Sequence, residues 1–286
     1  MATTVAAFAA AATRPAHAQA FASEPERVTI DGFIGEAQNP FISRDGRYLF
    51  FNNRNDAPER TNIVVAVRID ARTFRSLGPL VGANSPSLDS TPSMDRMGRF
   101  IFVSMRSYER TLHSVFAGVF ENDEVRAVRP VQGVAAPERG RIIFDAEISA
   151  DGGSLYYVDG RFIFGQTLPW EADIMIARRY GQRFARDRRY ERLFENVNTG
   201  ALEYAPSTSA DERELYFTRA PRPPAPFSRP QIWRATRGDP SVPFNEPERL
   251  PLEGHVEAPS VAPDGSIYFH RRDDGRFRLY RLPRAR

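Results

Sequence analysis

One short hairpin motif occurs five times along the chain, and this repetition restricts the fold more than any other feature of the sequence. The copies read QNPFISRDGRYLFFNN from Gln38, STPSMDRMGRFIFVSM from Ser90, FDAEISADGGSLYYVD from Phe144, YAPSTSADERELYFTR from Tyr204 and EAPSVAPDGSIYFHRR from Glu257. Their turn positions lie 52, 54, 60 and 53 residues apart. A repeat period near 50 residues is typical of the blades of a propeller.

Each copy predicts a short strand, a tight hairpin turn and a second, buried strand. The first strand opens at a proline in all copies but the third, which has alanine: Pro40, Pro92, Ala146, Pro206 and Pro259. The turn position is glycine in all but the fourth copy: Gly46, Gly98, Gly152, Glu212 and Gly265. Such turns need residues that tolerate a positive φ angle. The aromatic and β-branched runs that follow the turn, such as YLFF and LYYV, favour a strand buried between sheets.

Two further strands complete each predicted unit. The third strands begin at Asn62, His113, Asp173, Gln231 and Phe277. Weaker fourth strands are expected at FRSLGPLV, EVRAVRPV, YERLFENV and PERLPLEG. Four antiparallel strands per repeat form a propeller blade. We therefore predict an all-β, five-bladed β-propeller of four-stranded antiparallel blades, with an open solenoid or a two-sheet sandwich as the alternatives.

The fifth unit stops after its third strand, at Arg286. The segment ERVTIDGF from Glu26 resembles ERLPLEGH from Glu248, which is the expected outer strand of the fourth unit. We therefore expect the N-terminal strand to complete the last blade. Such a strand would close the ring and cover an otherwise open sheet edge.

The N-terminal residues have the character of an export signal. An apolar run, Val5 to Ala12, precedes small residues at Ala16, Ala18 and Ala20, although no basic side chain comes before the run. This pattern predicts a secretory signal peptide over residues 1–20 and one propeller domain over residues 21–286, in the periplasm or outside the cell. No later apolar run approaches the roughly 18 residues of a membrane-spanning helix, so no membrane span is expected.

The composition excludes several kinds of chemistry. All 39 basic residues are arginine and 36 acidic residues balance them, which leaves a net charge of +3 and predicts no nucleic-acid partner. The chain contains no cysteine, and its four histidines have no ligand-like spacing, so no metal or other cofactor is predicted. The chain also lacks the G-x-S-x-G, H-E-x-x-H and P-loop motifs. No catalytic residue is assigned.

The segments SADERELYFTR, SADGGSLYYV and APDGSIYFHRR resemble the WD40-like PD40 repeat of TolB-type propellers, over roughly residues 26–286. The resemblance implies an exported bacterial protein of the periplasm or envelope that binds protein or glycan more often than it catalyses a reaction. Within these 286 residues the motif occurs five times rather than six, and no segment is expected to form the helical domain that precedes the TolB propeller. The partners of TolB are therefore not implied.

An acidic residue precedes each innermost strand, near the expected mouth of the central channel: Glu36, Asp89, Asp145, Glu203 and Glu257. Two carboxyl groups at a suitable distance could act as the acid and the nucleophile or base of a glycosidase. Such groups could equally bind a ligand or cation, or they could pair with arginines and cap turns. Their distance from the aligned proline varies between copies, which argues against a ring of equivalent ligands.

The loops between second and third strands share this face of the disc, which we call the loop face. The long loops of the third and fourth units present Trp170 and Phe227, with Arg222 and Arg271 nearby. Aromatic and arginine side chains on loops suit binding of a sugar or a protein. Alternatively, Trp170 and the aromatic residues of its loop could pack down as a lid on the channel. We therefore predict a monomeric binding or scaffolding module that recognises an envelope protein or a glycan. The alternative function is that of a five-bladed glycosidase.

Overall fold

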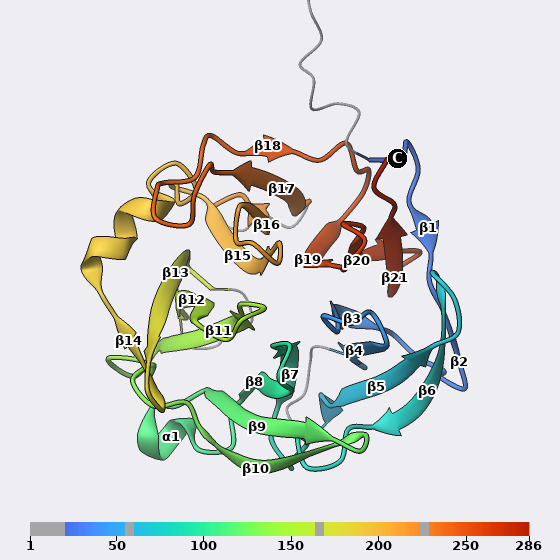
Figure 1. Ribbon diagram of the computed structural model, residues 1–286, viewed down its shortest axis with the longest axis horizontal. Coiled ribbons are helices and arrows are strands. Elements are labelled where there is room, and N and C mark those ends of the chain that lie inside the picture. Colours follow the sequence, from blue (N-terminus) through green and yellow to red (C-terminus); the bar gives the residue numbers. More distant parts are fainter. Residues whose placement is uncertain (1–20, 55–59, 164–168, 224–228, 286) are drawn as a thin grey trace, which may run out of the picture.

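The computed structural model describes residues 21–54, 60–163, 169–223 and 229–285. Five sheets stand around a central axis, each with its first strand innermost and its last strand at the rim (Figure 1). The predicted five-bladed β-propeller is confirmed.

The blades follow one another in chain order. Blade one holds β3 (Gln38–Ile42), β4 (Tyr48–Asn52), β5 (Ile63–Arg68) and β6 (Thr73–Pro79). Blade two holds β7 (Asp89–Met94), β8 (Arg99–Ser104), β9 (Val115–Glu121) and β10 (Glu124–Pro130). Blade three holds β11 (Arg141–Ile148), β12 (Ser154–Arg161), β13 (Glu171–Tyr180) and β14 (Arg183–Arg186). Blade four holds β15 (Leu202–Thr208), β16 (Glu214–Ala220), β17 (Gln231–Thr236) and β18 (Glu248–Arg249). Blade five holds β19 (Val256–Val261), β20 (Ile267–Asp273) and β21 (Arg276–Leu282), and its outermost strand is β1 (Glu26–Arg27).

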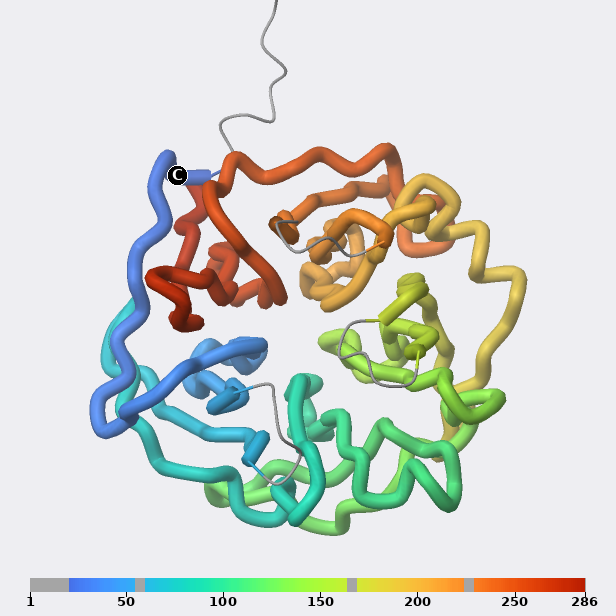
Figure 2. The backbone as a smooth tube through the Cα atoms, turned by 180° about the vertical axis from the view of Figure 1, so that it is seen from behind, coloured from blue at the N-terminus to red at the C-terminus, as the bar shows by residue number. Residues whose placement is uncertain are grey.

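The N-terminal segment closes the ring, as its likeness to the fourth outer strand predicts. Strand β1 pairs antiparallel with β21 of blade five. The chain then crosses to blade one, where β2 (Thr29–Asp31) adds a parallel fifth strand beside β6. Figure 2 shows this segment, in blue, running along the rim from the last blade to the first. One segment therefore ties the two ends of the chain together.

The predicted fourth strand of blade three, YERLFENV, is wrong. Those residues belong largely to a 3-10 helix, η3 (Arg188–Phe194), and the fourth strand is instead the earlier β14. The Asp187 side chain accepts the backbone N–H of Arg189 and caps the helix start, while Leu193 and Phe194 are buried. The apolar residues of this segment therefore reach the core by a helical turn rather than by strand alternation. The other helix among the described residues, α1 (Tyr108–Thr111), is a single turn.

The core is divided among the blade interfaces. Five apolar clusters each fill the space between two neighbouring sheets, and the second strands contribute the largest buried side chains. Between blades one and two, for example, the rings of Phe50, Phe100 and Phe120 meet at centroid distances of 5.0–6.2 Å. The aromatic runs of the sequence thus hold adjacent blades together. None of the helices among the described residues is long and apolar enough to cross a membrane.

A bulge recurs at one place in every innermost strand. The residue before the aligned proline or alanine has a positive φ angle: Asn39, Thr91, Asp145, Ala205 and Ala258, with φ between 46° and 53°. The pairing with the second strand shifts at this point in each blade. A bulge bends the strand and redirects its side chains. The bulges surround the central channel and determine which side chains point into it.

At four of the five bulges, those of Asn39, Thr91, Ala205 and Ala258, the freed N–H group donates to a side chain of the preceding blade. The N–H of Ala258 donates to Oγ1 of Thr218 (2.9 Å), and that of Thr91 donates to Oδ1 of Asn52 (3.0 Å). Both acceptors lie on second strands, opposite the residue before the bulge. Blade three has an apolar residue, Val158, at this position, so no acceptor is available there.

Candidate functional site

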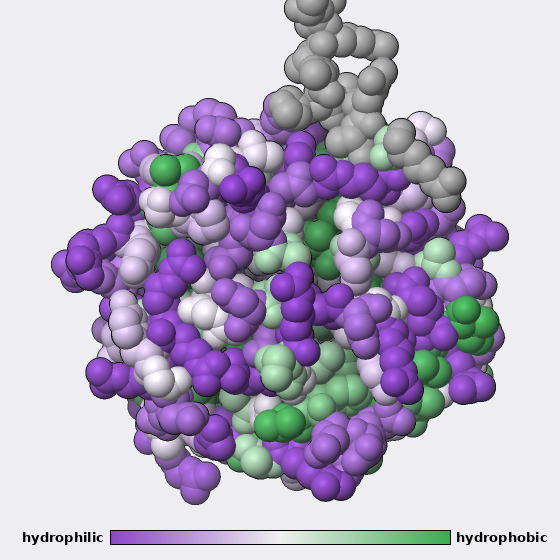
Figure 3. Space-filling model, viewed as in Figure 1, coloured by the Kyte–Doolittle hydropathy of each residue, from purple (hydrophilic) through white to green (hydrophobic). Residues whose placement is uncertain are grey.

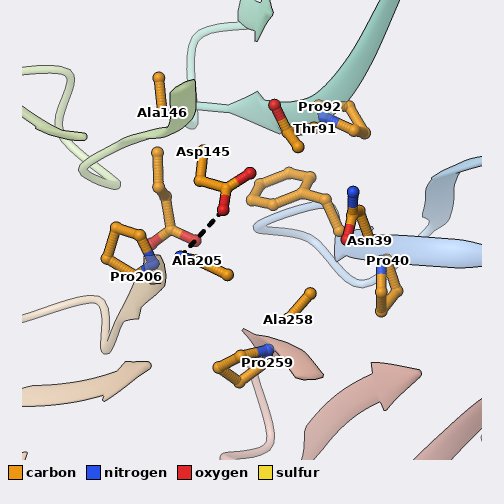
Figure 4. A pocket seen from close by; sticks show the side chains of 12 residues that line it. Asn39, Pro40, Thr91, Pro92, Asp145, Ala146, Ala205, Pro206, Ala258 and Pro259 are labelled. Atoms are coloured by element: carbon orange, nitrogen blue, oxygen red, sulfur yellow. Dashed lines mark hydrogen bonds between the residues drawn. The ribbon is translucent and has the colours of Figure 1, made fainter. Parts of the chain in front are cut away.

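The central channel is nearly filled. Between the bulges it leaves a cavity of about 40 Å³, which can hold a few water molecules but no sugar ring. Figure 4 shows the side chains that line it, with the carboxyl group of Asp145 directed into the cavity. The five bulges thus bring residues from every blade to one point.

A buried ion pair crosses the channel beside this cavity. Arg44, from the hairpin turn of blade one, reaches Oε1 of Glu147 in blade three at 3.2 Å and donates to the Ile148 carbonyl at 2.8 Å. Both side chains of the pair are less than a tenth exposed. Glu147 also accepts the backbone N–H of Thr208 in blade four, at 2.7 Å. One carboxylate therefore links three blades and blocks the channel.

Asp145 supplies the acceptor that blade three lacks. Its Oδ2 atom accepts the N–H of Ala205 in blade four at 3.1 Å, and this bond replaces the one that a polar residue would make from the position of Val158. Burial among protein atoms raises the pKa of Asp145 to about 7, and the hydrogen bond from Ala205 only partly offsets that rise. The negative charge of Glu257 raises it further. Asp145 is thus a carboxyl group that is partly protonated at neutral pH.

Asp145→Asn is expected to change how stability depends on pH. The pKa of Asp145 is about 7 in the folded protein and near 3.9 in the unfolded chain. Between those values the folded state holds a proton that the unfolded state has lost, so this group makes the wild type less stable as the pH rises. Asparagine can still accept from Ala205 and cannot ionise. Urea unfolding should show that the free energy of unfolding of the variant, relative to that of the wild type, rises by roughly 2–4 kcal/mol between pH 4 and pH 8.

The control for this experiment is Asp274→Asn, at an exposed hairpin position. If both asparagine variants followed the wild-type pH profile, the Asp145 carboxyl group would not be the titrating group that we infer.

Glu257 lies at the centre of a second cluster on the channel side of blade five. Its Oε1 atom accepts the hydroxyl group of Tyr204, and its Oε2 atom lies 2.8 Å from Nε2 of His255 and 3.1 Å from Nε2 of His270. Burial acts to raise the pKa of Glu257, but the hydrogen bonds from the two histidines outweigh it and hold the pKa well below its usual range. Glu257 is therefore a carboxylate at neutral pH.

The tautomer of His270 follows from its two contacts. The N–H of Asn39, at the bulge of blade one, donates to Nδ1 of His270 at 3.1 Å. Nδ1 must then be unprotonated, so the ring carries its proton on Nε2 and donates it to Glu257. Burial and the Glu257 charge raise the pKa of Tyr204 well above its usual value, so this hydroxyl group also remains a donor.

The remaining predicted acids serve the structure. Asp89 binds Arg106 at 2.7 Å and accepts from Ser85, while Glu203 binds Arg219 at 2.7 Å and accepts from Thr199. Both occupy the position three residues before the aligned proline, and both are fully buried. This arrangement is the pairing with arginine that was one of the predicted alternatives.

The fifth acid, Glu36, accepts the N–H of Phe277 at 3.3 Å. Of the five acids, Asp145 and Glu257 are the two whose positions and charge states would suit a catalytic acid and base.

The loop face brings two of the predicted binding residues together. The indole of Trp170 is 36% exposed, and the guanidinium group of Arg222 lies 5.4 Å from its ring centre. Arg222 also reaches Glu171 at 3.4 Å, and Glu171 contacts Arg141 at 3.4 Å. We call Trp170, Glu171 and Arg222 the Trp170 platform. It joins the loop of blade three to the segment that follows β16 of blade four.

The other predicted binding residues lie elsewhere. Phe227 is outside the described residues. Arg271 lies on β20 of blade five and pairs with Asp273, apart from the Trp170 platform. Sequence reasoning missed Arg44, Glu147, Tyr204, His255 and His270. One signal was available in the sequence. At the position after the aligned proline or alanine, the third copy has Glu147 where three other copies have serine.

The face of the disc seen in Figure 3 is mostly hydrophilic, and its hydrophobic residues gather toward the lower right, on the side of blades one and two. Exposed apolar side chains on those blades include Ile69, Leu77, Val81 and Val119. Single exposed apolar residues are normal on protein surfaces.

Comparison with solved structures shows the fold and leaves the function open. No protein-family pattern and no curated protein matches the sequence. A BT0996–RGII complex is similar with a TM-score of 0.65 and 10% identity, over 93% of this chain and 92% of that one. An endo-arabinase from Bacteroides thetaiotaomicron is similar with a TM-score of 0.53 and 16% identity, over 90% and 97%.

TolB from Acinetobacter baumannii matches with a TM-score of 0.48 and 14% identity, over 87% of this chain and 54% of that one. That score is too low to bear on the PD40 resemblance, which therefore stays a prediction.

Proposed function

We propose that this protein is a recognition module that binds a glycan on its loop face, with the Trp170 platform as the main contact. The observation that carries the proposal is an exposed indole beside a guanidinium group and a carboxylate. Sugars are bound by an aromatic surface against their C–H groups together with polar side chains that hydrogen-bond their hydroxyl groups. The Trp170 platform combines both kinds of group on a rigid scaffold.

The similar structures also favour a glycan over a protein partner. One of them is a complex with RGII, and another is an endo-arabinase. At 10–16% identity these proteins share the fold with this chain, so their ligands serve only as a guide. We also propose that the protein acts in the bacterial periplasm or outside the cell, because residues 1–20 resemble a signal peptide.

Trp170→Ala is expected to weaken glycan binding at least about tenfold, because a truncated aromatic contact at a binding surface costs about 2 kcal/mol. Residues 21–286 would be screened on a glycan array, and the affinity for the best glycan would be measured by calorimetry. Arg222→Ala should weaken binding by a similar factor.

Tyr180→Ala serves as the control, since Tyr180 is an exposed aromatic residue at the far end of β13, the strand that begins directly after Trp170. Wild-type affinity in the Trp170→Ala variant would refute the platform. Capture of an envelope protein in place of any glycan would assign the surface to a protein partner instead.

A glycoside hydrolase is the second candidate function, and one observation favours it. The environments of Asp145 and Glu257 shift their pKa values in opposite directions, as in an acid and base pair. Two observations oppose it: both oxygens of Glu257 already accept hydrogen bonds, and the channel cavity measures about 40 Å³. Release of new reducing ends from a bound glycan, lost in Asp145→Asn, would favour the hydrolase.

A further inference from the structure

A cationic groove lies on strands β20, β21 and β1 of blade five. It has a volume of about 530 Å³, within the range of ligand sites, and polar residues line it. Four of these residues are arginines: Arg27, Arg271, Arg272 and Arg278. Two aspartates and Tyr280 complete the lining. The groove therefore carries an excess of positive charge.

The strand register gathers three of the arginines on one face of the sheet. Arg271 of β20 stands directly opposite Arg278 of β21, and Arg27 of β1 stands opposite Tyr280. Residues two apart on a strand point to the same side, so Arg278 and Tyr280 share that face. Like charges placed directly opposite each other destabilise a sheet. A bound anion would remove this cost.

Blade four provides an internal comparison, because its residues align with those of blade five. Arg219 takes the place of Arg271, but it binds the inner-strand carboxylate of Glu203 at 2.7 Å and faces Gln231 rather than another arginine. Its guanidinium group lies 4.5 Å from the ring of Trp233. In blade four, therefore, the arginine at this position is neutralised by a carboxylate of the same blade.

Blade five lacks this pairing of an arginine with an inner-strand carboxylate. Val256 stands where blade four has Glu203, so Arg271 turns to Asp273 at 2.7 Å and covers the ring of Tyr280 at 3.9 Å. Among the residues that the structure describes, no carboxylate lies within ion-pair distance of Arg27, Arg272 or Arg278. The guanidinium groups of Arg27 and Arg278 are therefore available to bind an external anion, whereas that of Arg272 lies 5.8 Å from the ring centre of Phe277.

We propose that this groove binds a carboxylate or sulfate group of an acidic saccharide, with Arg27 and Arg278 as the principal donors. A guanidinium group forms paired hydrogen bonds with such oxyanions. Nucleic acid fits less well, because the proteins that bind it as a single strand stack bases on exposed aromatic rings, whereas Tyr280 is only 7% exposed and covered by Arg271. This groove is separate from the Trp170 platform and does not depend on the function proposed for it.

The test is calorimetric titration of residues 21–286 with trigalacturonate and with a heparin-derived trisaccharide. Maltotriose serves as the uncharged probe, and inorganic sulfate as the free anion. We expect both acidic saccharides to bind, with an affinity that falls as sodium chloride is added, and maltotriose not to bind in the groove. Arg278→Gln, which installs the residue of blade four, should weaken binding about tenfold.

Arg249→Ala is the matched control, because Arg249 occupies in blade four the position that Arg27 occupies in blade five. Arg27→Ala should weaken binding while Arg249→Ala leaves it unchanged, and thermal unfolding should confirm that each variant is folded. Retention of acidic-saccharide binding in Trp170→Ala would show that the two surfaces are distinct. The proposal would be overturned if no acidic saccharide bound, or if Arg249→Ala weakened binding as much as Arg27→Ala. Inorganic sulfate that bound as tightly as the saccharides would overturn the saccharide assignment.

Discussion

Arg44→Met is expected to lower the free energy of unfolding by about 3–5 kcal/mol, although Arg44 lies in a hairpin turn. The substitution removes the only cationic partner of Glu147 among the described residues and leaves a carboxylate whose side chain is 6% exposed. A buried charge without a partner is much less favourable than a buried pair. Glu147 also joins blades three and four through Thr208, so the loss should affect the whole ring. Urea unfolding followed by tryptophan fluorescence would measure it.

Two further variants make this prediction specific. Arg47→Met, in the same turn but exposed, should change the free energy of unfolding by less than about 0.5 kcal/mol. Adding Glu147→Gln to Arg44→Met should restore much of the lost stability, because glutamine keeps an acceptor for the Thr208 N–H without the charge. A cost no larger than that of Arg47→Met would mean that the ion pair does not hold the channel together.

Removal of the N-terminal segment, residues 21–33, should lower the free energy of unfolding at least as much. Compared with residues 21–286, a protein that begins at residue 34 loses the buried Val28, the partly buried Ile30 and the ring of Phe33, which meets Phe51 at 4.9 Å. At about 1.5–3 kcal/mol for each buried side chain, the expected loss is about 5 kcal/mol or more. The edges of β21 and β6 would also be exposed, which favours aggregation. Thermal unfolding and gel filtration would measure both effects.

Two point variants test whether the buried side chains of the segment account for this stabilisation. Val28→Ala should destabilise the protein, whereas Ile34→Ala should have no effect, because Ile34 is fully exposed. An unchanged unfolding midpoint after removal of the segment would show that the ring closes without it.

The fold was predictable because the same local signals occur in every unit. Turn residues at Gly46, Gly98 and their counterparts place each hairpin, and the aromatic strand after each turn has the composition of a buried strand. Where a unit lost its signal, the prediction failed. In blade three the apolar residues Leu193 and Phe194 suggested a strand, but the capping carboxylate of Asp187 starts a helical turn there.

The candidate site was predictable only in part. Exposed loops made Trp170 and Arg222 reasonable candidates, and the structure brings them together. The five acids all precede an innermost strand, although at varying distances from the aligned proline, and they take four different roles. Glu36 accepts the backbone N–H of Phe277. Asp89 and Glu203 face arginines across the blade, Asp145 replaces a missing acceptor, and Glu257 binds two histidines. Those roles depend on the residues opposite each acid, which belong to other strands or other blades.

The sequence by itself determined the number of blades, the hairpin turns, the buried second strands and the closing N-terminal strand, because each follows from residues close together in the chain or from a repeated pattern. Only the tertiary structure decided the contents of the channel. Arg44 and Glu147 are 103 residues apart, and the N–H of Asn39 meets His270 across 231 residues. A closed ring brings the bulges of its innermost strands to one axis, so the charge state of each group there depends on neighbours that no local pattern records.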